Sequence, residues 1–217
     1  MTVAAVSDVR PPAAMPALAK RAFDVALAGF GLALSAPLWL LVAAVIKLED
    51  RGPVFYRQER VAQRGGTFRV LKFRSMAPDA EKTTGAVWAS AQDPRITRVG
   101  RWLRATALDE LPQLLNVFRG DMSFVGPRPE RPKFVQQFAR SIPRYMERFE
   151  ARPGLTGLAQ VYGQYASPPR SKLRYDLLYI RRRTFWLDLR LIVLSFWITF
   201  MGRWEQRGRK IPRWTKR

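Results

Sequence analysis

The sequence predicts an α/β fold of mostly helical (α+β) type, in which one apolar helix lies beside a small domain that contains a short β-hairpin. Residues 25–46 form an uncharged apolar run, and residues 54–76 hold two strand-like segments around a glycine pair. From Arg101 onward the apolar spacing becomes helical. With 217 residues, 47% of them hydrophobic, the chain is long enough for one core with short appendages.

The residue content limits the chemistry that the chain can perform. It has no cysteine and no histidine, which excludes disulfides, thiolate metal sites and the commonest general base. The net charge of +21 predicts attraction to nucleic acid, anionic lipid or a phosphorylated substrate. Because basic residues flank the long apolar run, we favour a membrane over a nucleic acid.

Residues 20–47 are expected to form a membrane helix behind a mobile leader at 1–19. Ser35 and Pro37 fall near the middle of the run and predict a break in the helix. Basic residues lie at both ends, so charge gives no preferred direction of crossing. The hypothesis is a re-entrant helix with both ends in the cytoplasm, and an ordinary kinked transmembrane helix is the open alternative.

The rest of the chain, residues 48–202, is expected to form the main domain. Residues 54–60 and 67–76 predict a hairpin around Gly65-Gly66. An apolar stripe at three- and four-residue steps predicts a helix with one buried face, made of Leu111, Leu114, Leu115 and Phe118. Further helices are expected around 134–138 and 173–179, with glycine- and proline-rich loops at 120–132 and 152–157.

The end of the chain is aromatic and then strongly basic. Residues 185–200 are too short an apolar stretch to span a bilayer comfortably after Asp188 and Arg190, and predict an interfacial amphipathic helix. The tail at 203–217 has seven basic residues and one acidic residue, a composition that suits anionic lipid headgroups. A solvated tail is the alternative.

Two adjacent acids, Asp109 and Glu110, stand where a helix is expected to start, with Thr106 as its candidate cap. Carboxylates near a helix N-terminus stay ionised, and an ionised carboxylate can act as a nucleophile. Neighbouring helical residues project about 100° apart, so one acid could attack while the other binds metal or handles a proton. The alternative is a pair of surface charges that complement the helix dipole.

Arginines near the acid pair could offset the charge of a phosphate substrate. The candidates are Arg104, Arg128 and Arg131, and the turn at 126–129 would hold one of them stiffly. A carboxylate that attacks phosphorus needs such cations, because both reactants are negatively charged.

The order of these segments resembles that of the bacterial sugar transferases known as small monotopic phosphoglycosyl transferases. The resemblance runs from about residue 20 to residue 200. It is carried by KRAFD at 20–24, the serine and proline at 35 and 37, GPVFYRQERV at 52–61, FRVLKFRSM at 68–76, DPRITRVGRWLRATALDELPQLLNVFRGDMSFVGPRP at 93–129 and RPGLTGLAQV at 152–161.

The resemblance implies an enzyme that moves a sugar-1-phosphate from a UDP-sugar to polyprenyl (undecaprenyl) phosphate and starts membrane-linked glycan or exopolysaccharide synthesis. It implies Mg²⁺ and an aspartyl phosphosugar intermediate. Asp109 would be the nucleophile and a metal ligand, and Glu110 would assist with metal or proton. The residues expected to contact substrate are Arg104, Pro127, Arg128, Pro129, Lys72 and Arg74.

We expect the domain on the cytoplasmic face of the bacterial inner membrane. The basic residues are expected to contact anionic lipid and not nucleic acid. A homodimer stays an open alternative. The sequence departs from the family pattern at Ala36, at Ala107 and at residues 162–164, and the last departure bears on which sugar is used. Two other functions are weighed against this one: a membrane-tethered binder of nucleic acid or anionic lipid, and a metal-dependent phosphodiester hydrolase.

Overall fold

The computed structural model describes residues 15–82, 85, 87, 93–163 and 167–200, and the predicted basic tail and most of the predicted leader lie outside these residues. Its helices are α1 (Ala17–Asp50), α2 (Arg98–Ala105), α3 (Gln113–Arg119), α4 (Pro132–Ser141), α5 (Leu158–Tyr162), α6 (Pro169–Arg182) and α7 (Phe185–Phe200). Short 3₁₀ turns are η1 (Gln63–Gly65), η2 (Leu108–Glu110) and η3 (Tyr145–Glu150). The strands are β1 (Phe55–Val61), β2 (Thr67–Phe73), β3 (Ser123–Val125) and β4 (Gly154–Thr156).

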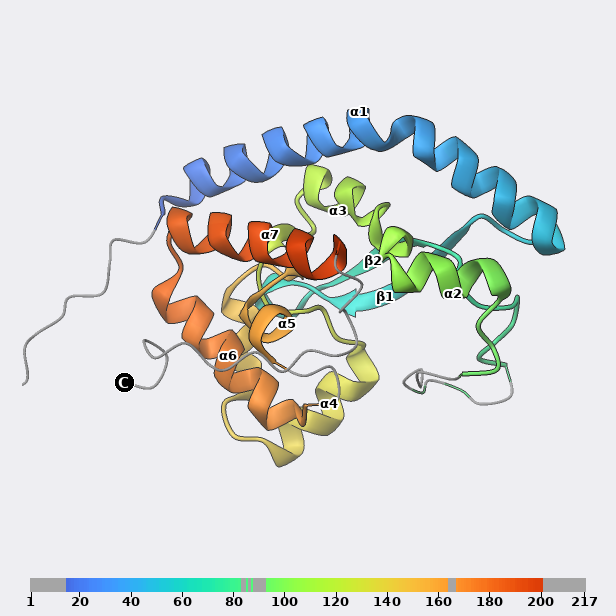
Figure 1. Cartoon of the computed structure of the whole chain (residues 1–217). Helices are drawn as coiled ribbons and strands as arrows, with labels where there is room; N and C mark the ends of the chain where they lie inside the picture. Colours follow the sequence, from blue (N-terminus) through green and yellow to red (C-terminus); the bar gives the residue numbers. More distant parts are fainter. Residues whose placement is uncertain (1–14, 83–84, 86, 88–92, 164–166, 201–217) are drawn as a thin grey trace, which may run out of the picture.

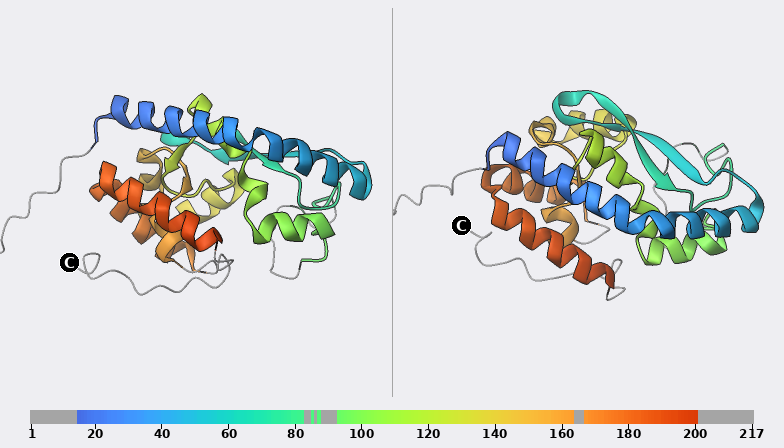
Figure 2. Two further views of the ribbon diagram at one scale, coloured as in Figure 1. Left: turned by 45° about the horizontal axis from the view of Figure 1, so that its top comes forward. Right: turned by 90° about the horizontal axis from the view of Figure 1, so that it is seen from above.

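Helix α1 crosses one whole side of the domain as a bent but continuous helix (Figures 1 and 2). It runs through Ser35 and Pro37 without the predicted interruption, and it extends beyond the predicted residues 20–47 at both ends. The Ser35 hydroxyl donates to the Gly31 carbonyl at 2.6 Å and accepts from the Trp39 indole at 3.0 Å. A serine hydroxyl bonded to the carbonyl four residues earlier and a proline that cannot donate both bend a helix, which agrees with the bend of the continuous α1.

A buried polar cluster fastens the start of α1 to the domain. The Lys20 ammonium lies 2.7 Å from Asp188 of α7, and Asp24 accepts from the Ser123 hydroxyl and the Phe124 amide, both at 3.1 Å. Asp24 and Asp188 are almost fully buried, so these partners offset the cost of desolvating them.

The end of α1 is fastened to the same domain. The Glu49 carboxylate accepts from the amides of Arg98 and Val99 at 2.7 and 3.2 Å, and so caps the N-terminus of α2. Asp50 forms an ion pair with the buried Arg74, which follows β2. Both ends of α1 are therefore attached to the same domain.

The hairpin is confirmed. Strands β1 and β2 pair antiparallel, with Phe55 opposite Phe73 and Val61 opposite Thr67. The short strands β3 and β4 pair parallel in a separate sheet. Asn116 joins α3 to β2, because its side chain accepts from the Leu71 amide and donates to the Arg69 carbonyl, both at 2.9 Å.

The main core lies between α1, the hairpin, α3, α5 and α7. The predicted stripe on α3 is only partly right: Leu114 is buried, whereas Phe118 is 45% exposed and Leu115 is half-buried. The face of α3 that is buried carries Gln113, Leu114, Asn116 and Val117. Leu111 lies before α3, which begins only at Gln113, so the four predicted residues do not share one helix.

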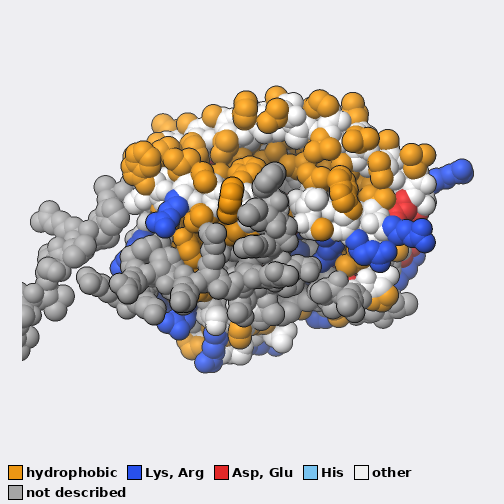
Figure 3. All heavy atoms as spheres, viewed as in Figure 1, with side chains coloured by type: hydrophobic (Ala, Val, Ile, Leu, Met, Phe, Trp, Pro, Cys, Tyr) orange, Lys and Arg blue, Asp and Glu red, His pale blue; other side chains and the backbone are white. Residues whose placement is uncertain are grey.

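Apolar side chains gather along the outer side of the molecule that α1 forms (Figure 3). By length and composition α1 could cross a membrane, and only 11% of its most apolar window is buried in the protein. Helix α7, predicted as interfacial, also turns large apolar residues outward while its acidic residue points inward. The exposed residues include Phe30, Leu34, Leu40 and Leu41 on α1, and Trp186, Val193, Phe196 and Trp197 on α7.

Candidate active site

The acid pair lies in the 3₁₀ turn η2, between α2 and α3. Thr106 does not cap this turn, contrary to prediction: it ends α2, and its hydroxyl donates to the Trp102 carbonyl at 2.9 Å. The next residue, Ala107, has a left-handed backbone with φ of 54°, which turns the chain between the two helices. As a result Asp109 and Glu110 both point into the protein, and each is only 8% exposed.

Glu110 binds two cations from different parts of the chain. It lies 2.8 Å from the Lys72 ammonium on β2 and 2.6 Å from the Arg128 guanidinium in the loop after β3. Burial alone would raise the pKa of Glu110, but the charges and hydrogen bonds of Arg128 and Lys72 outweigh it and hold that pKa well below its usual range. Glu110 is therefore ionised, and its oxygens are occupied.

Asp109 has the opposite environment. Among the described residues none donates a hydrogen bond to its carboxylate. Burial raises the pKa of Asp109 to about 6; the charge of Glu110 adds to this, while Lys72, Arg104 and Arg128 oppose it. At neutral pH the side chain is thus mostly ionised and carries no bond that must break before it reacts. The two acids therefore have different environments, and their separate roles stay a prediction.

The predicted phosphate-binding loop at 126–129 is fixed through its backbone. The Gly126 amide donates to Thr156 and the Gly154 amide donates to Pro127, both at 2.9 Å. A Cβ on Gly126 would lie 2.2 Å from the Arg152 carbonyl oxygen, so only glycine allows β3 and β4 to approach this closely. Pro127 and Pro129 are buried, whereas the Arg128 side chain extends to Glu110 and is 37% exposed.

Five of the predicted residues therefore lie close enough for their charges to interact: Asp109, Glu110, Lys72, Arg104 and Arg128. Two other predicted arginines are occupied elsewhere. Arg74 pairs with Asp50 at the end of α1, and Arg131 makes two hydrogen bonds to Glu81 at 2.8 and 2.9 Å.

A buried ion pair behind the loop was not predicted from the sequence. Arg148 of η3 lies 2.8 Å from Asp176 of α6, and its guanidinium also donates to the Arg128 carbonyl at 3.0 Å. Both side chains are almost fully buried. Neither residue lies in a recognisable sequence motif. Arg148 is directed inward by the 3₁₀ turn η3, which the sequence did not predict.

The predicted Mg²⁺ can be tested against the donor set. No group of three or more acidic side chains converges within the described part of the chain. Mg²⁺ commonly binds through one or two carboxylates together with substrate phosphates, and Asp109 offers such an oxygen while Glu110 is already paired. The residues thus fit a metal that arrives with a diphosphate.

Comparison with known proteins decides the family. Residues 15–202 match the family model described as bacterial sugar transferase. The chain belongs to the bacterial sugar transferase family. It is thus a transferase by family, and the constellation around Asp109 is the candidate active site of such an enzyme.

Several relatives are similar to most of this chain. It is 44% identical over 199 residues to the UDP-glucose:undecaprenyl-phosphate glucose-1-phosphate transferase of Caulobacter vibrioides, covering 85% of this chain and 72% of the relative. It is 45% identical to the UDP-N-acetylgalactosamine-undecaprenyl-phosphate N-acetylgalactosaminephosphotransferase of Aeromonas hydrophila, covering 83% and 43%. It is 38% identical to the exopolysaccharide production protein ExoY of Rhizobium meliloti, covering 85% of each. The chain therefore spans less than half of some relatives and most of others.

Proposed function

We propose that this chain transfers a sugar-1-phosphate from a UDP-sugar to polyprenyl phosphate, with release of UMP. The observation that carries the proposal is the buried Asp109 carboxylate, which has no hydrogen-bond donor among the described residues and lies amid Lys72, Arg104 and Arg128. The names of the relatives from C. vibrioides and A. hydrophila support this reaction class.

In the first step an Asp109 oxygen attacks the β-phosphorus of the donor. A new bond forms between that oxygen and phosphorus, and the bond from phosphorus to the bridging oxygen breaks, so that UMP leaves with the electron pair. The sugar phosphate is then an acyl phosphodiester on Asp109. Arg104 and Arg128 would stabilise the negative charge on the phosphate oxygens during this displacement.

In the second step a phosphate oxygen of the polyprenyl acceptor attacks the same phosphorus and releases Asp109 as a carboxylate. The acceptor is already an anion, so no general base is needed, which agrees with a chain that lacks histidine. Glu110 keeps Lys72 and Arg128 in place through both steps, because it binds both cations directly.

Asp109, together with the diphosphate of the donor, would hold Mg²⁺. The metal supplies charge neutralisation for the leaving UMP. We infer a location at the cytoplasmic face of the inner membrane, with α1 as a re-entrant helix. The attachment of both Lys20 and Asp50 to one domain supports this topology, because a straight crossing would carry one end away from that domain.

Trapping the covalent intermediate tests the proposal. The protein in nanodiscs without acceptor lipid is mixed with a panel of UDP-sugars, quenched, digested and examined by mass spectrometry. The peptide that contains Asp109 should gain one sugar phosphate, and UMP should be released in equal amount. Asp109→Asn should abolish both, while the matched control Asp79→Asn, an exposed aspartate, should retain them.

A second part of the experiment, in which acceptor lipid is added, distinguishes a transferase from a hydrolase. Addition of polyprenyl phosphate should discharge the peptide and yield a lipid diphosphosugar. Release of free sugar phosphate without lipid product would instead indicate hydrolysis. Full lipid-linked product from Asp109→Asn would refute the proposed nucleophile.

A further inference from the structure

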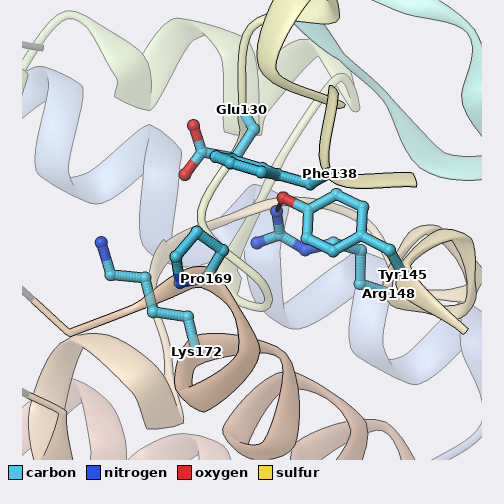
Figure 4. A pocket seen from close by; sticks show the side chains of 6 residues that line it. All are labelled: Glu130, Phe138, Tyr145, Arg148, Pro169 and Lys172. Atoms are coloured by element: carbon cyan, nitrogen blue, oxygen red, sulfur yellow. Dashed lines mark hydrogen bonds between the residues drawn. The ribbon is translucent and has the colours of Figure 1, made fainter. Parts of the chain in front are cut away.

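A small pocket lies next to the loop at 126–129, where Glu130, α4, the turn η3 and the start of α6 meet (Figure 4). Helix α4 lies on the side of the domain away from α1 (Figure 1). Its lining combines one acid, two cations, two aromatic rings and a proline: Glu130, Arg148, Lys172, Phe138, Tyr145 and Pro169.

The pocket is joined to the candidate active site through Arg128. Arg148, which forms its inner wall, donates to the Arg128 carbonyl at 3.0 Å, and the Arg128 side chain reaches Glu110 at 2.6 Å. Glu130 is separated from Arg128 by a single residue, Pro129. The charge of Arg128 also interacts with that of Lys172 in the pocket, so phosphates bound at Arg128 would place the next group of the ligand beside the pocket.

The polar groups of the pocket differ in how they are occupied. Arg148 is held on all sides, because it bonds to Asp176, to the Tyr145 hydroxyl at 2.7 Å and to the Arg128 carbonyl. The partly buried Glu130 carboxylate receives no hydrogen bond from any described residue. In Figure 4 this carboxylate projects to the same open side as the Lys172 ammonium, with the Phe138 ring next to it.

A carboxylate acceptor at the edge of aromatic rings suits a ligand with neighbouring hydroxyl groups and a flat ring that can stack. Acidic side chains bind ribose hydroxyls in this way in other nucleotide sites, and aromatic faces accept nucleobases by stacking. We propose that the pocket receives the nucleoside end of the UDP-sugar, with the Glu130 carboxylate accepting hydrogen bonds from the ribose hydroxyls. This inference rests on the proposed function, since that function supplies the nucleotide.

The position of the pocket argues against the polyprenyl tail as its occupant. The tail of the polyprenyl acceptor must stay in the bilayer, and the apolar surface of α1 lies on the opposite side of the domain from α4 (Figures 1 and 3). UMP leaves opposite Asp109, because the displacement at phosphorus is in line, and it must depart into water before the acceptor enters. We therefore assign the nucleoside, and not the lipid tail, to the side of α4 and α6.

Nucleotide binding tests the proposal without relying on turnover. Calorimetry on the full chain in nanodiscs would compare UDP with its 2′-deoxy and 3′-deoxy analogues, for the wild type, for Glu130→Gln and for Glu130→Ala. A hydrogen bond to a charged acceptor is worth about 1.5–3 kcal/mol, so loss of the bonded hydroxyl should weaken wild-type binding roughly 10- to 100-fold. In both Glu130 variants UDP and the deoxy analogue should bind with nearly equal affinity. Glu59→Gln, which removes an exposed acid on β1, should keep the wild-type preference.

The outcomes are decisive in each direction. If the Glu130 variants retain the full preference for ribose, or if the wild type has no preference or no affinity for UDP, the pocket is not the ribose site. UMP release from UDP-sugars is measured in parallel. If the Glu130 variants keep the wild-type preference for ribose while UMP release is normal, only the assignment of the pocket is refuted. If the ribose preference depends on Glu130 but no sugar phosphate is transferred, only the transferase reaction is refuted.

Discussion

Asp109→Asn should make the protein more stable while it removes turnover. Burial raises the pKa of Asp109 from 3.8 to about 6. A difference of about two pKa units corresponds to about 3 kcal/mol, at 1.36 kcal/mol for each unit. This free energy is the cost of burying the ionised carboxylate, and an uncharged asparagine of the same shape does not carry it.

The sign of the pH dependence follows from linkage. The folded protein binds the Asp109 proton more tightly than the unfolded chain, so this group costs nothing below about pH 3.8. Its cost grows as the pH rises through about 6 and is complete above that value. The stability gain of Asp109→Asn should therefore be near zero at pH 4 and about 3 kcal/mol at pH 8.

Thermal unfolding in one detergent or nanodisc, without nucleotide or metal, measures this gain. For a chain of about 200 residues, 3 kcal/mol corresponds to a Tm increase of roughly 6–12 °C. Asp79→Asn removes an exposed carboxylate and should change Tm little at either pH. A Tm gain for Asp109→Asn that is absent at pH 8, or that is equal at pH 4 and pH 8, would refute the assignment of a desolvated and ionised Asp109.

Three further changes follow from the same contacts. Lys72→Met removes the cation that most favours ionised Asp109, so the acid limb of the pH profile of kcat/KM should move up by about one to three pH units, and an unchanged limb would contradict the assignment. Arg148→Met leaves Asp176 buried without its partner, which should lower the free energy of unfolding by about 3–5 kcal/mol in denaturant titration; a loss within experimental error would show the pair to be unimportant. Gly100→Ala places a Cβ 2.0 Å from a backbone carbonyl oxygen and should cost about 1–3 kcal/mol or more in the same titration, whereas no loss would mean that α2 can shift away.

The sequence predicted the parts of the fold that depend on local pattern. The hairpin follows from alternation and a glycine pair, and α7 follows from an apolar run with the predicted bounds of 185–200. Asp109 and Glu110 could be predicted as candidate site residues because the two acids are adjacent in the sequence. Thr106 was misassigned because the left-handed Ala107 turns the chain one residue later, and no pattern in the sequence marks an alanine for that conformation.

Long-range partners could not be predicted from the same patterns. Lys72 and Arg128 reach Glu110 across 38 and 18 residues of chain, and many other basic residues have similar local contexts. Arg148 and Asp176 form a pair only because η3 and α6 pack together. Periodicity identifies which side chains face inward on one element, but the choice of partner depends on how separate elements meet.

Asp109 and Glu110 differ in environment because the nearby cations bind only one of them directly. Lys72 and Arg128 bind Glu110 directly, so their charge reaches Asp109 only at longer range and does not cancel its desolvation. If these cations bound Asp109 instead, its pKa would fall and its lone pairs would be occupied, which would make it a weak nucleophile. Three cations beside two carboxylates also leave an excess of positive charge, which suits an incoming diphosphate. The partner acid thus keeps Asp109 unbonded, while the three cations, acting at longer range, keep it mostly ionised at neutral pH.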